Sequence, residues 1–151
     1  NKFNFTLVLA TGFGVGYLPG APGTYGSFLA LIIYFFLPHS LLSYSIFMIF
    51  AIILGIFSAH QAEKTFKIKD PSQIVIDEML GYWVALWNLP PILPYIFSAF
   101  FLFRFFDIIK PYPICSLEKL RGGIGIIFDD LMAGFYSWCI LQLAKTLVSL
   151  L

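Results

Sequence analysis

The stretch "LLSYSIFMIFAIILGIFSA", from Leu41 to Ala59, decides the fold class of this chain. It has no charged side chain, and its 19 residues match the roughly 20 apolar residues with which a helix crosses a bilayer core. The whole composition agrees, because 60% of the 151 residues are hydrophobic and only 11% are charged. Soluble domains are about a quarter charged. The sequence therefore predicts an integral membrane protein.

Apolar segments on both sides of this stretch predict further helices. Proline-containing breaks at 38–40 and 88–94 mark turns. We expect an all-α membrane bundle of about four to five spans, forming one domain over residues 1–151. The first and third segments are short enough to be partly re-entrant. The predicted helices are about Thr24 to Leu37, Leu41 to Lys64, Ser72 to Asn88, Leu93 to Ile109 and Asp129 to Leu150.

The position of the basic residues predicts the orientation of the bundle. Most lie in the connections 63–70 and 110–121, which the positive-inside rule places in the cytoplasm. All acids then lie at or near the cytoplasmic helix ends, while the long stem of Lys145 reaches the outer interface. A net charge of +1 gives no reason to expect nucleic acid as a partner. The residues placed inside are Lys2, Lys64, Lys67, Lys69, Lys110, Lys119 and Arg121.

The stretch "QIVIDEMLGYWVALW", from Gln73 to Trp87, surrounds Asp77 and Glu78 with apolar residues. Ionisable residues at membrane depth usually mark a functional interior. Steps of three or four residues from the acids reach small residues, which line helix contacts in membranes. The acids should therefore face the bundle interior, although salt bridges or helix caps, with Asp129 as an N-cap, are the structural alternative. The small residues are Gly55, Ala59, Gly81, Ala85, Ala133, Gly134 and Ser137.

The chemistry of these residues favours a phosphate site. Carboxylates without a Cys or His cluster favour Mg²⁺ or Mn²⁺, and the nearby Arg104 and Lys110 favour an anionic phosphoryl substrate. The loop "TGFGVGYLPGAPGTYGS" brings Thr24 and Ser27 to the first turn of a helix, where amides are free to meet an anion. His60, one turn before Glu63, is either an acid–base group or a hydrogen-bonded interfacial histidine, and we favour the latter.

A rival pattern is "CSLEKLR", from Cys115 to Arg121, which has the Cys-x5-Arg spacing of cysteine phosphatases. Such a loop must offer backbone amides to phosphate and usually contains glycine. Here it contains Leu, Lys and Glu118, whose charge repels an anion. We disfavour this chemistry, and a Cys115→Ser variant would test it.

Four motifs together closely resemble the bacterial phosphatidylglycerophosphatase A family, in order from about Gly12 to Ser137. They are "GVGYLPGAPGTYGS", "IVIDEMLGYW", "FLFRFFDIIKPYP" and "GGIGIIFDDLMAGFYS". The resemblance implies a Mg²⁺-dependent phosphatase of phospholipid biosynthesis in the bacterial cytoplasmic membrane, with its active site facing the cytoplasm. It would convert phosphatidylglycerophosphate, a phospholipid, into phosphatidylglycerol and phosphate. The matched motif residues are Asp77 and Glu78, then Arg104, Asp107 and Lys110, then Asp129 and Asp130.

Roles follow from this match and from the residue chemistry. We expect catalysis to use Glu63, Arg104, Asp107 and Asp130, with Glu63 as a general base or an outer residue. We expect the substrate to contact Thr24, His60, Arg104 and Lys110. The expected Mg²⁺ ligands are Asp77, Glu78, Asp107, Asp129 and Asp130.

Several alternatives stay open in the sequence. Either a water or an aspartate attacks phosphorus, and we favour water because the Asp-x-Asp signature of phospho-aspartate enzymes is absent. A small cation transporter or channel is a second function, and it predicts acids near the bilayer midplane. A metal-dependent lipid phosphotransferase is a third, although its usual Asp-Gly…Ala-Arg motif is missing. The oligomeric state is not set by the sequence, which is compatible with a homo-oligomer.

Overall fold

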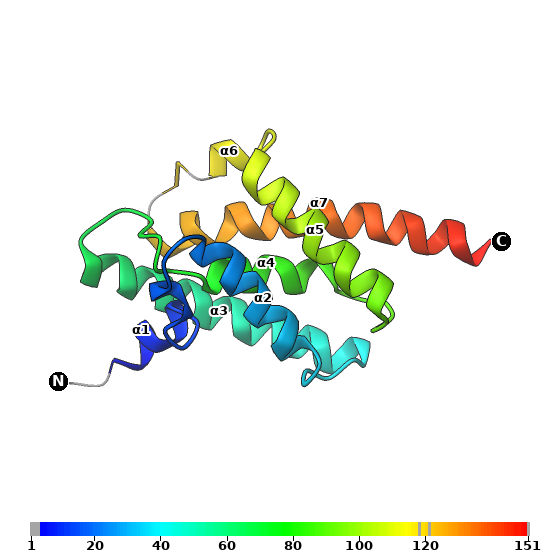
Figure 1. Ribbon diagram of the computed structural model, residues 1–151, viewed down its shortest axis with the longest axis horizontal. Coiled ribbons are helices and arrows are strands. Elements are labelled where there is room, and N and C mark those ends of the chain that lie inside the picture. The colour runs from blue at the N-terminus through cyan, green and yellow to red at the C-terminus, as the bar shows by residue number, and fades with distance from the viewer. Residues whose placement is uncertain (1–3, 118, 121, 151) are drawn as a thin grey trace.

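The computed structural model describes residues 4–117, 119–120 and 122–150. Within these ranges every regular element is helical, which confirms the all-α prediction (Figure 1). A short 3-10 turn, η1, covers Val15–Tyr17. The helices are α1 Phe5–Ala10, α2 Pro22–Tyr34, α3 Leu41–Phe66, α4 Ile76–Ala85, α5 Leu93–Ile109, α6 Ile114–Leu117 and α7 Gly122–Ser149.

The largest difference from prediction is the start of α7. This helix begins at Gly122, seven residues before the predicted start at about Asp129, so the alternative in which Asp129 caps the helix is wrong. The glycine-rich "GGIG" resembles a loop but is helical because it packs against the backbone of α3. A Cβ at Gly123 would lie only 2.1 Å from the Ile56 carbonyl oxygen. Lys2, Glu118 and Arg121, used in the predictions above, lie outside the described residues.

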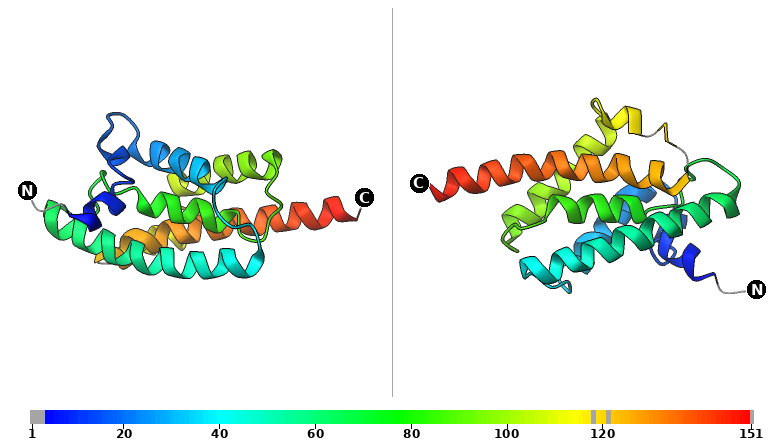
Figure 2. Two further views of the ribbon diagram at one scale, coloured as in Figure 1. Left: turned by 90° about the horizontal axis from the view of Figure 1, so that it is seen from below. Right: turned by 180° about the vertical axis from the view of Figure 1, so that it is seen from behind.

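Helices α2, α3, α4, α5 and α7 run alternately in opposite directions along the molecule (Figures 1 and 2). The first residues of α2, α4 and α7 and the last residues of α3 and α5 therefore meet at one end, on the left of Figure 1. We call this the site end. The short α4 lies in the middle, with most of its side chains buried. The bundle thus gathers helix ends that are far apart in the sequence, as predicted.

The outer surface of the bundle is strongly apolar. Phe50 and Ile53 on α3 are 64% and 60% exposed, and Phe101 on α5 is 69% exposed. Large exposed apolar surfaces mark contact with a membrane or a partner. In the described chain, α3 and α7 are long and apolar enough to cross a membrane, with 26 and 28 residues. Since α2, α4 and α5 have 13, 10 and 17 residues, the number of spans stays a prediction.

Small residues bring α4 and α7 into backbone contact. A Cβ at Gly134 would lie 2.1 Å from the Gly81 carbonyl oxygen, and a Cβ at Gly81 would lie 2.5 Å from the Asp130 carbonyl oxygen. The predicted small-residue faces are confirmed, because Ala85 and Ala133 are also fully buried. This contact places the Asp130 turn of α7 directly against α4.

We expect Gly134→Ala to destabilise the fold, because its methyl group would meet fixed backbone. Overpacking of this kind costs about 1–3 kcal/mol or more. Thermal unfolding of purified protein in detergent, followed by circular dichroism, measures the loss. Leu143→Ala on the same helix is the control, since Leu143 is 63% exposed and should change the midpoint little. Equal midpoints for wild type and Gly134→Ala would contradict this account of the α4–α7 contact.

Candidate active site

Three acids from two helices form a cluster at the site end. Asp77 and Glu78 lie in the first turn of α4, and Asp130 lies on α7. One carboxylate oxygen from each lies within 4.8 Å of the other two. Asp77 and Asp130 are only 8% and 3% exposed. We call these three residues the acidic cluster.

The acidic cluster has unsatisfied oxygen atoms. Among the described residues, Asp77 Oδ1, Glu78 Oε2 and Asp130 Oδ2 are buried and have no hydrogen-bond partner. Buried carboxylates without partners are costly, and like charges at this spacing repel one another. A hard divalent cation takes oxygen ligands and would remove both costs. The cluster therefore fits the metal-binding acidic site that the sequence predicts.

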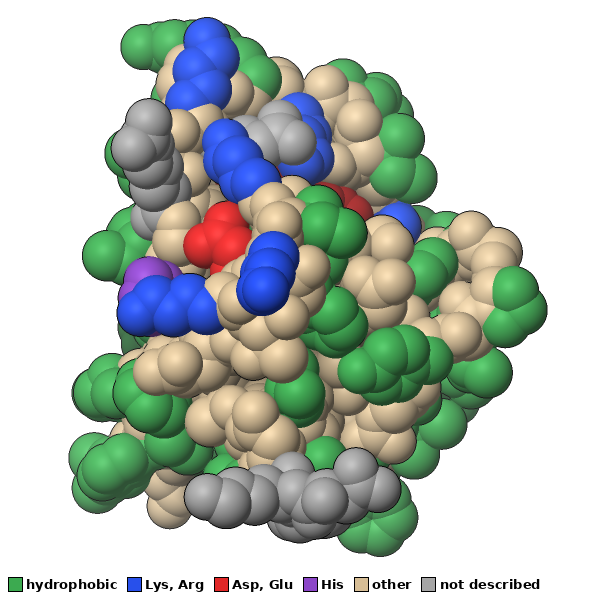
Figure 3. All heavy atoms as spheres, turned by 90° about the vertical axis from the view of Figure 1, so that its left-hand side faces the viewer, with side chains coloured by type: hydrophobic (Ala, Val, Ile, Leu, Met, Phe, Trp, Pro, Cys, Tyr) green, Lys and Arg blue, Asp and Glu red, His purple; other side chains and the backbone are tan. Residues whose placement is uncertain are grey.

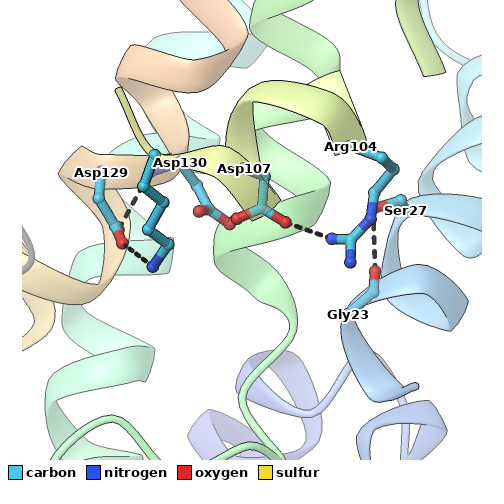
Figure 4. A network of polar contacts seen from close by, with 7 residues as sticks. Gly23, Ser27, Arg104, Asp107, Asp129 and Asp130 are labelled. Atoms are coloured by element: carbon cyan, nitrogen blue, oxygen red, sulfur yellow. Dashed lines mark hydrogen bonds and ion pairs between the residues drawn. The ribbon is translucent and has the colours of Figure 1, made fainter. Parts of the chain in front are cut away.

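Two cations lie beside the acidic cluster, each paired with another acid. Arg104 forms an ion pair with Asp107, one turn further along α5 (Figure 4). Lys110 Nζ donates to Asp129 Oδ2 at 2.9 Å. In the close-up, the Asp107 carboxylate lies between Arg104 and Asp130. The five predicted metal ligands thus divide into three clustered acids and two, Asp107 and Asp129, that hold cations.

The acidic cluster lines a cavity of about 240 Å³ together with Asp107, Lys110 and Asp129. The first turn of α2 closes one side with Pro22 and Gly23, and the connection before α4 adds Asp70 and Ser72. Figure 3 looks at this end of the molecule and shows Lys and Arg side chains around acidic ones. The exposed lysines at this end are Lys64, Lys67, Lys69 and Lys119. The cavity is therefore acidic inside, with a basic surround suited to an anionic ligand.

Three further residues that the sequence predicts for the site lie at two places in the structure. Thr24 follows Gly23 in the first turn of α2 but is not itself among the described residues that line the cavity. His60 and Glu63 lie near the end of α3, beside the start of α7, and not among the described residues that line the cavity. A Cβ at Gly122 would lie 2.8 Å from His60 Nδ1 and 3.9 Å from Glu63 Oε2. Thr24 is thus the neighbour of a residue in the cavity wall, and none of these three residues is part of the described lining.

Sequence reasoning missed two polar residues of the cavity wall, Asp70 and Ser72. Asp70 follows a lysine-rich segment and resembles an ordinary surface acid in the sequence. It reaches the cavity because the connection between α3 and α4 folds back over the first turn of α4. The sequence contains no periodic pattern from which the path of this connection could be predicted.

The family of the chain follows from its sequence. A family model described as phosphatidylglycerophosphatase A matches residues 8–145. The chain belongs to the phosphatidylglycerophosphatase A family. The match includes the whole acidic cluster and both flanking cations, and it confirms the resemblance carried by the four motifs.

Relatives of the chain include two proteins named phosphatidylglycerophosphatase A. The one from Haemophilus influenzae is 41% identical, covering 86% of this chain and 82% of the relative. The one from Escherichia coli is 38% identical, covering 86% and 77%. A Bacteroides thetaiotaomicron protein, by name a candidate phosphatidylinositol-3-phosphatase, is 38% identical over 94% of both chains. No solved structure matches the chain.

Family membership and geometry together weigh against the alternatives. A transporter requires acids near the bilayer midplane, whereas the acidic cluster of this phosphatidylglycerophosphatase A family member lies at the site end. Cys115 is exposed on α6 and is not among the described residues that line the acidic cavity. The structure therefore fits a phosphatase that uses carboxylates rather than a cysteine.

Proposed function

We propose that this chain is a Mg²⁺-dependent phosphatidylglycerophosphatase, which hydrolyses the terminal phosphate of phosphatidylglycerophosphate to give phosphatidylglycerol. The observation that carries the proposal is the acidic cluster, whose three unsatisfied oxygens lie beside Arg104 and Lys110. Family membership supplies the substrate class, a lipid phosphate monoester. A cation site next to two basic side chains is the usual arrangement for phosphoryl transfer.

We infer that residues 1–151 form one integral membrane domain with four to five spans and the site end facing the cytoplasm of a bacterium. The apolar outer surface and the lysines at the site end support this orientation. At the opposite end, Lys145 Nζ donates to the Asn88 carbonyl oxygen at 2.9 Å, which gives its charge a polar partner near the outer interface. The lipid acyl chains would then stay in the inner leaflet while the head group enters the cavity.

Asp77, Glu78 and Asp130 would hold the Mg²⁺ ion. Their free oxygens are hard ligands, and α4 and α7 fix them from two sides. When bound, the ion supplies positive charge against the phosphoryl oxygens and makes a nearby water more acidic. Side chains of the protein would orient the phosphate and accept a proton from the attacking water.

Arg104 and Lys110 would stabilise the charge that develops on the phosphoryl oxygens. Asp107 holds the Arg104 guanidinium, and Asp129 holds the Lys110 ammonium, so both donors are oriented before substrate binds. Arg104 Nε is buried without a hydrogen-bond partner among the described residues, which leaves it as a further donor. The first-turn amides at Gly23 and Thr24 would lie against phosphate or glycerol oxygens.

In the hydrolysis step, a water oxygen forms a bond to phosphorus while the bond between phosphorus and the glycerol oxygen breaks. The Asp107 carboxylate, which lines the cavity beside Asp130, would accept the proton of the water. The leaving glycerol oxygen takes up a proton from solvent, and the products are phosphatidylglycerol and inorganic phosphate. A direct role for Glu63 or His60 stays a prediction, and their place beside Gly122 favours support of α7.

The test is release of inorganic phosphate by purified protein from phosphatidylglycerophosphate in mixed micelles. We expect release with Mg²⁺ and loss of release to background with a chelator, because the acidic cluster then lacks its cation. Phosphatidylinositol 3-phosphate at the same mole fraction is the comparison substrate, given the name of the Bacteroides relative. Faster release from that lipid would change the substrate assignment.

Two further outcomes of this assay would reject the proposal. Transfer of phosphate to a second lipid, without free phosphate, would indicate a phosphotransferase. No release from any phospholipid monoester by folded protein would contradict phosphatase activity altogether.

A further inference from the structure

Gly23, in the first turn of α2, lies directly against two functional side chains. A Cβ at this position would lie 2.2 Å from Glu78 Oε1 and 3.2 Å from Arg104 Nη1. Real Cβ atoms essentially never come closer than 3.0 Å to another heavy atom. The Glu78 carboxylate therefore occupies space that any other residue at position 23 would fill (Figure 4 shows Gly23 facing Arg104).

The backbone of Gly23 does not explain why glycine stands there. Gly23 lies inside α2, and it is not among the described glycines with positive φ, which are Gly12, Gly14, Gly20 and Gly122. Alanine is a better helix former than glycine at a position with helical backbone. Glycine is needed at position 23 because it has no side chain, and the Glu78 carboxylate occupies the space that a side chain would fill.

Gly26, one turn later on α2, offers a contrast. A Cβ there would lie 2.7 Å from Val75 Cβ and 3.2 Å from the Val75 carbonyl oxygen. Val75 is fully buried, so these atoms cannot move without disturbing the core. At Gly23 the nearest atom is instead the end of a flexible side chain, which can rotate away. A methyl group at position 26 would strain the fold, whereas one at position 23 would displace Glu78.

We propose that Gly23 is a positioning residue that keeps the Glu78 carboxylate within the acidic cluster. The inference rests on the proposed function, because it takes the cluster to be the Mg²⁺ site. Glu78 is one of three residues whose oxygens lie within 4.8 Å, so its rotation would leave two acids in place. Position 23 thereby controls cation affinity without contacting the cation.

The experiment compares thermal unfolding of wild type, Gly23→Ala and Gly26→Ala in detergent, without substrate, over a Mg²⁺ titration. We expect Gly23→Ala to unfold in chelator at the wild-type midpoint or above it. The Mg²⁺ concentration that gives half of the stabilising shift should rise roughly 10- to 100-fold, as for residues that orient metal ligands. Gly26→Ala should unfold at a lower temperature in chelator and keep the wild-type Mg²⁺ dependence.

A double variant separates this role from a general packing effect. Because Gly23→Ala should act only through Glu78, adding it to Glu78→Ala should not change the Mg²⁺ dependence further. Unchanged Mg²⁺ dependence in Gly23→Ala, failure of Gly23→Ala to fold, or additive effects in the double variant would each overturn the inference. Absence of any Mg²⁺-dependent shift in wild type would instead contradict the metal site of the proposed function, before Gly23 is tested.

Discussion

Replacing Asp130 with Asn is expected to remove most Mg²⁺-dependent phosphate release. Asn has the same shape as Asp but carries no charge, and Asp130 Oδ2 is one of the three cluster oxygens without a partner in the described chain. Loss of residues that merely orient metal ligands costs roughly 10- to 100-fold, so loss of a ligand should cost at least that much. Phosphate release at several Mg²⁺ concentrations measures both the rate and the Mg²⁺ requirement.

The neighbouring Asp129 gives a matched control for Asp130. Asp129 Oδ2 accepts a 2.9 Å hydrogen bond from Lys110, so its charge is already balanced within the protein. We expect Asp129→Asn to release Lys110, weaken substrate binding and leave the Mg²⁺ requirement close to that of wild type. A larger loss of Mg²⁺ affinity in Asp129→Asn than in Asp130→Asn would contradict the division of the acids described above.

The sequence predicts those parts of the fold that depend on local signals. The bounds of α5, Leu93 to Ile109, agree with prediction because a proline pair precedes the helix and Lys110-Pro111 ends it. The helix faces with Gly81 and Gly134 also agree, because small residues at four-residue spacing have few other uses in an apolar helix. Helical periodicity and proline positions are therefore sufficient to predict the bounds of α5 and these packing faces.

The features that the sequence does not predict depend on contacts between distant segments. Gly122 and Gly123, at the start of α7, lie against α3, where a Cβ would meet His60 or the Ile56 carbonyl oxygen. The choice between Asp129 and Asp130 is open in sequence, since neighbours point about 100° apart around a helix. In the structure Lys110, nineteen residues away, pairs with Asp129, which favours Asp130 as the metal ligand. The same holds for Gly23, whose role appears only when Glu78 is placed beside it.

Arg104→Gln is expected to lower kcat by roughly 10³-fold, the lower limit for loss of an arginine that stabilises a transferring phosphoryl group. Its guanidinium pairs with Asp107 on one side, and its Nε lacks a partner among residues 4–117, 119–120 and 122–150. Replacing Arg104 therefore removes a positive charge and a hydrogen-bond donor, and it breaks the ion pair with Asp107. The Mg²⁺ requirement should change little, because Asp77, Glu78 and Asp130 are untouched.

Arg104→Lys separates charge from geometry. A lysine ammonium keeps the positive charge but lacks the planar fork that lets one side chain bind Asp107 and still offer donors to phosphate. We expect its kcat to lie between those of wild type and Arg104→Gln, with KM closer to wild type. Equal rates for Arg104→Lys and wild type would show that charge alone is used. Equal rates for Arg104→Gln and wild type would remove Arg104 from the reaction and leave Lys110 as the cation that meets the phosphate.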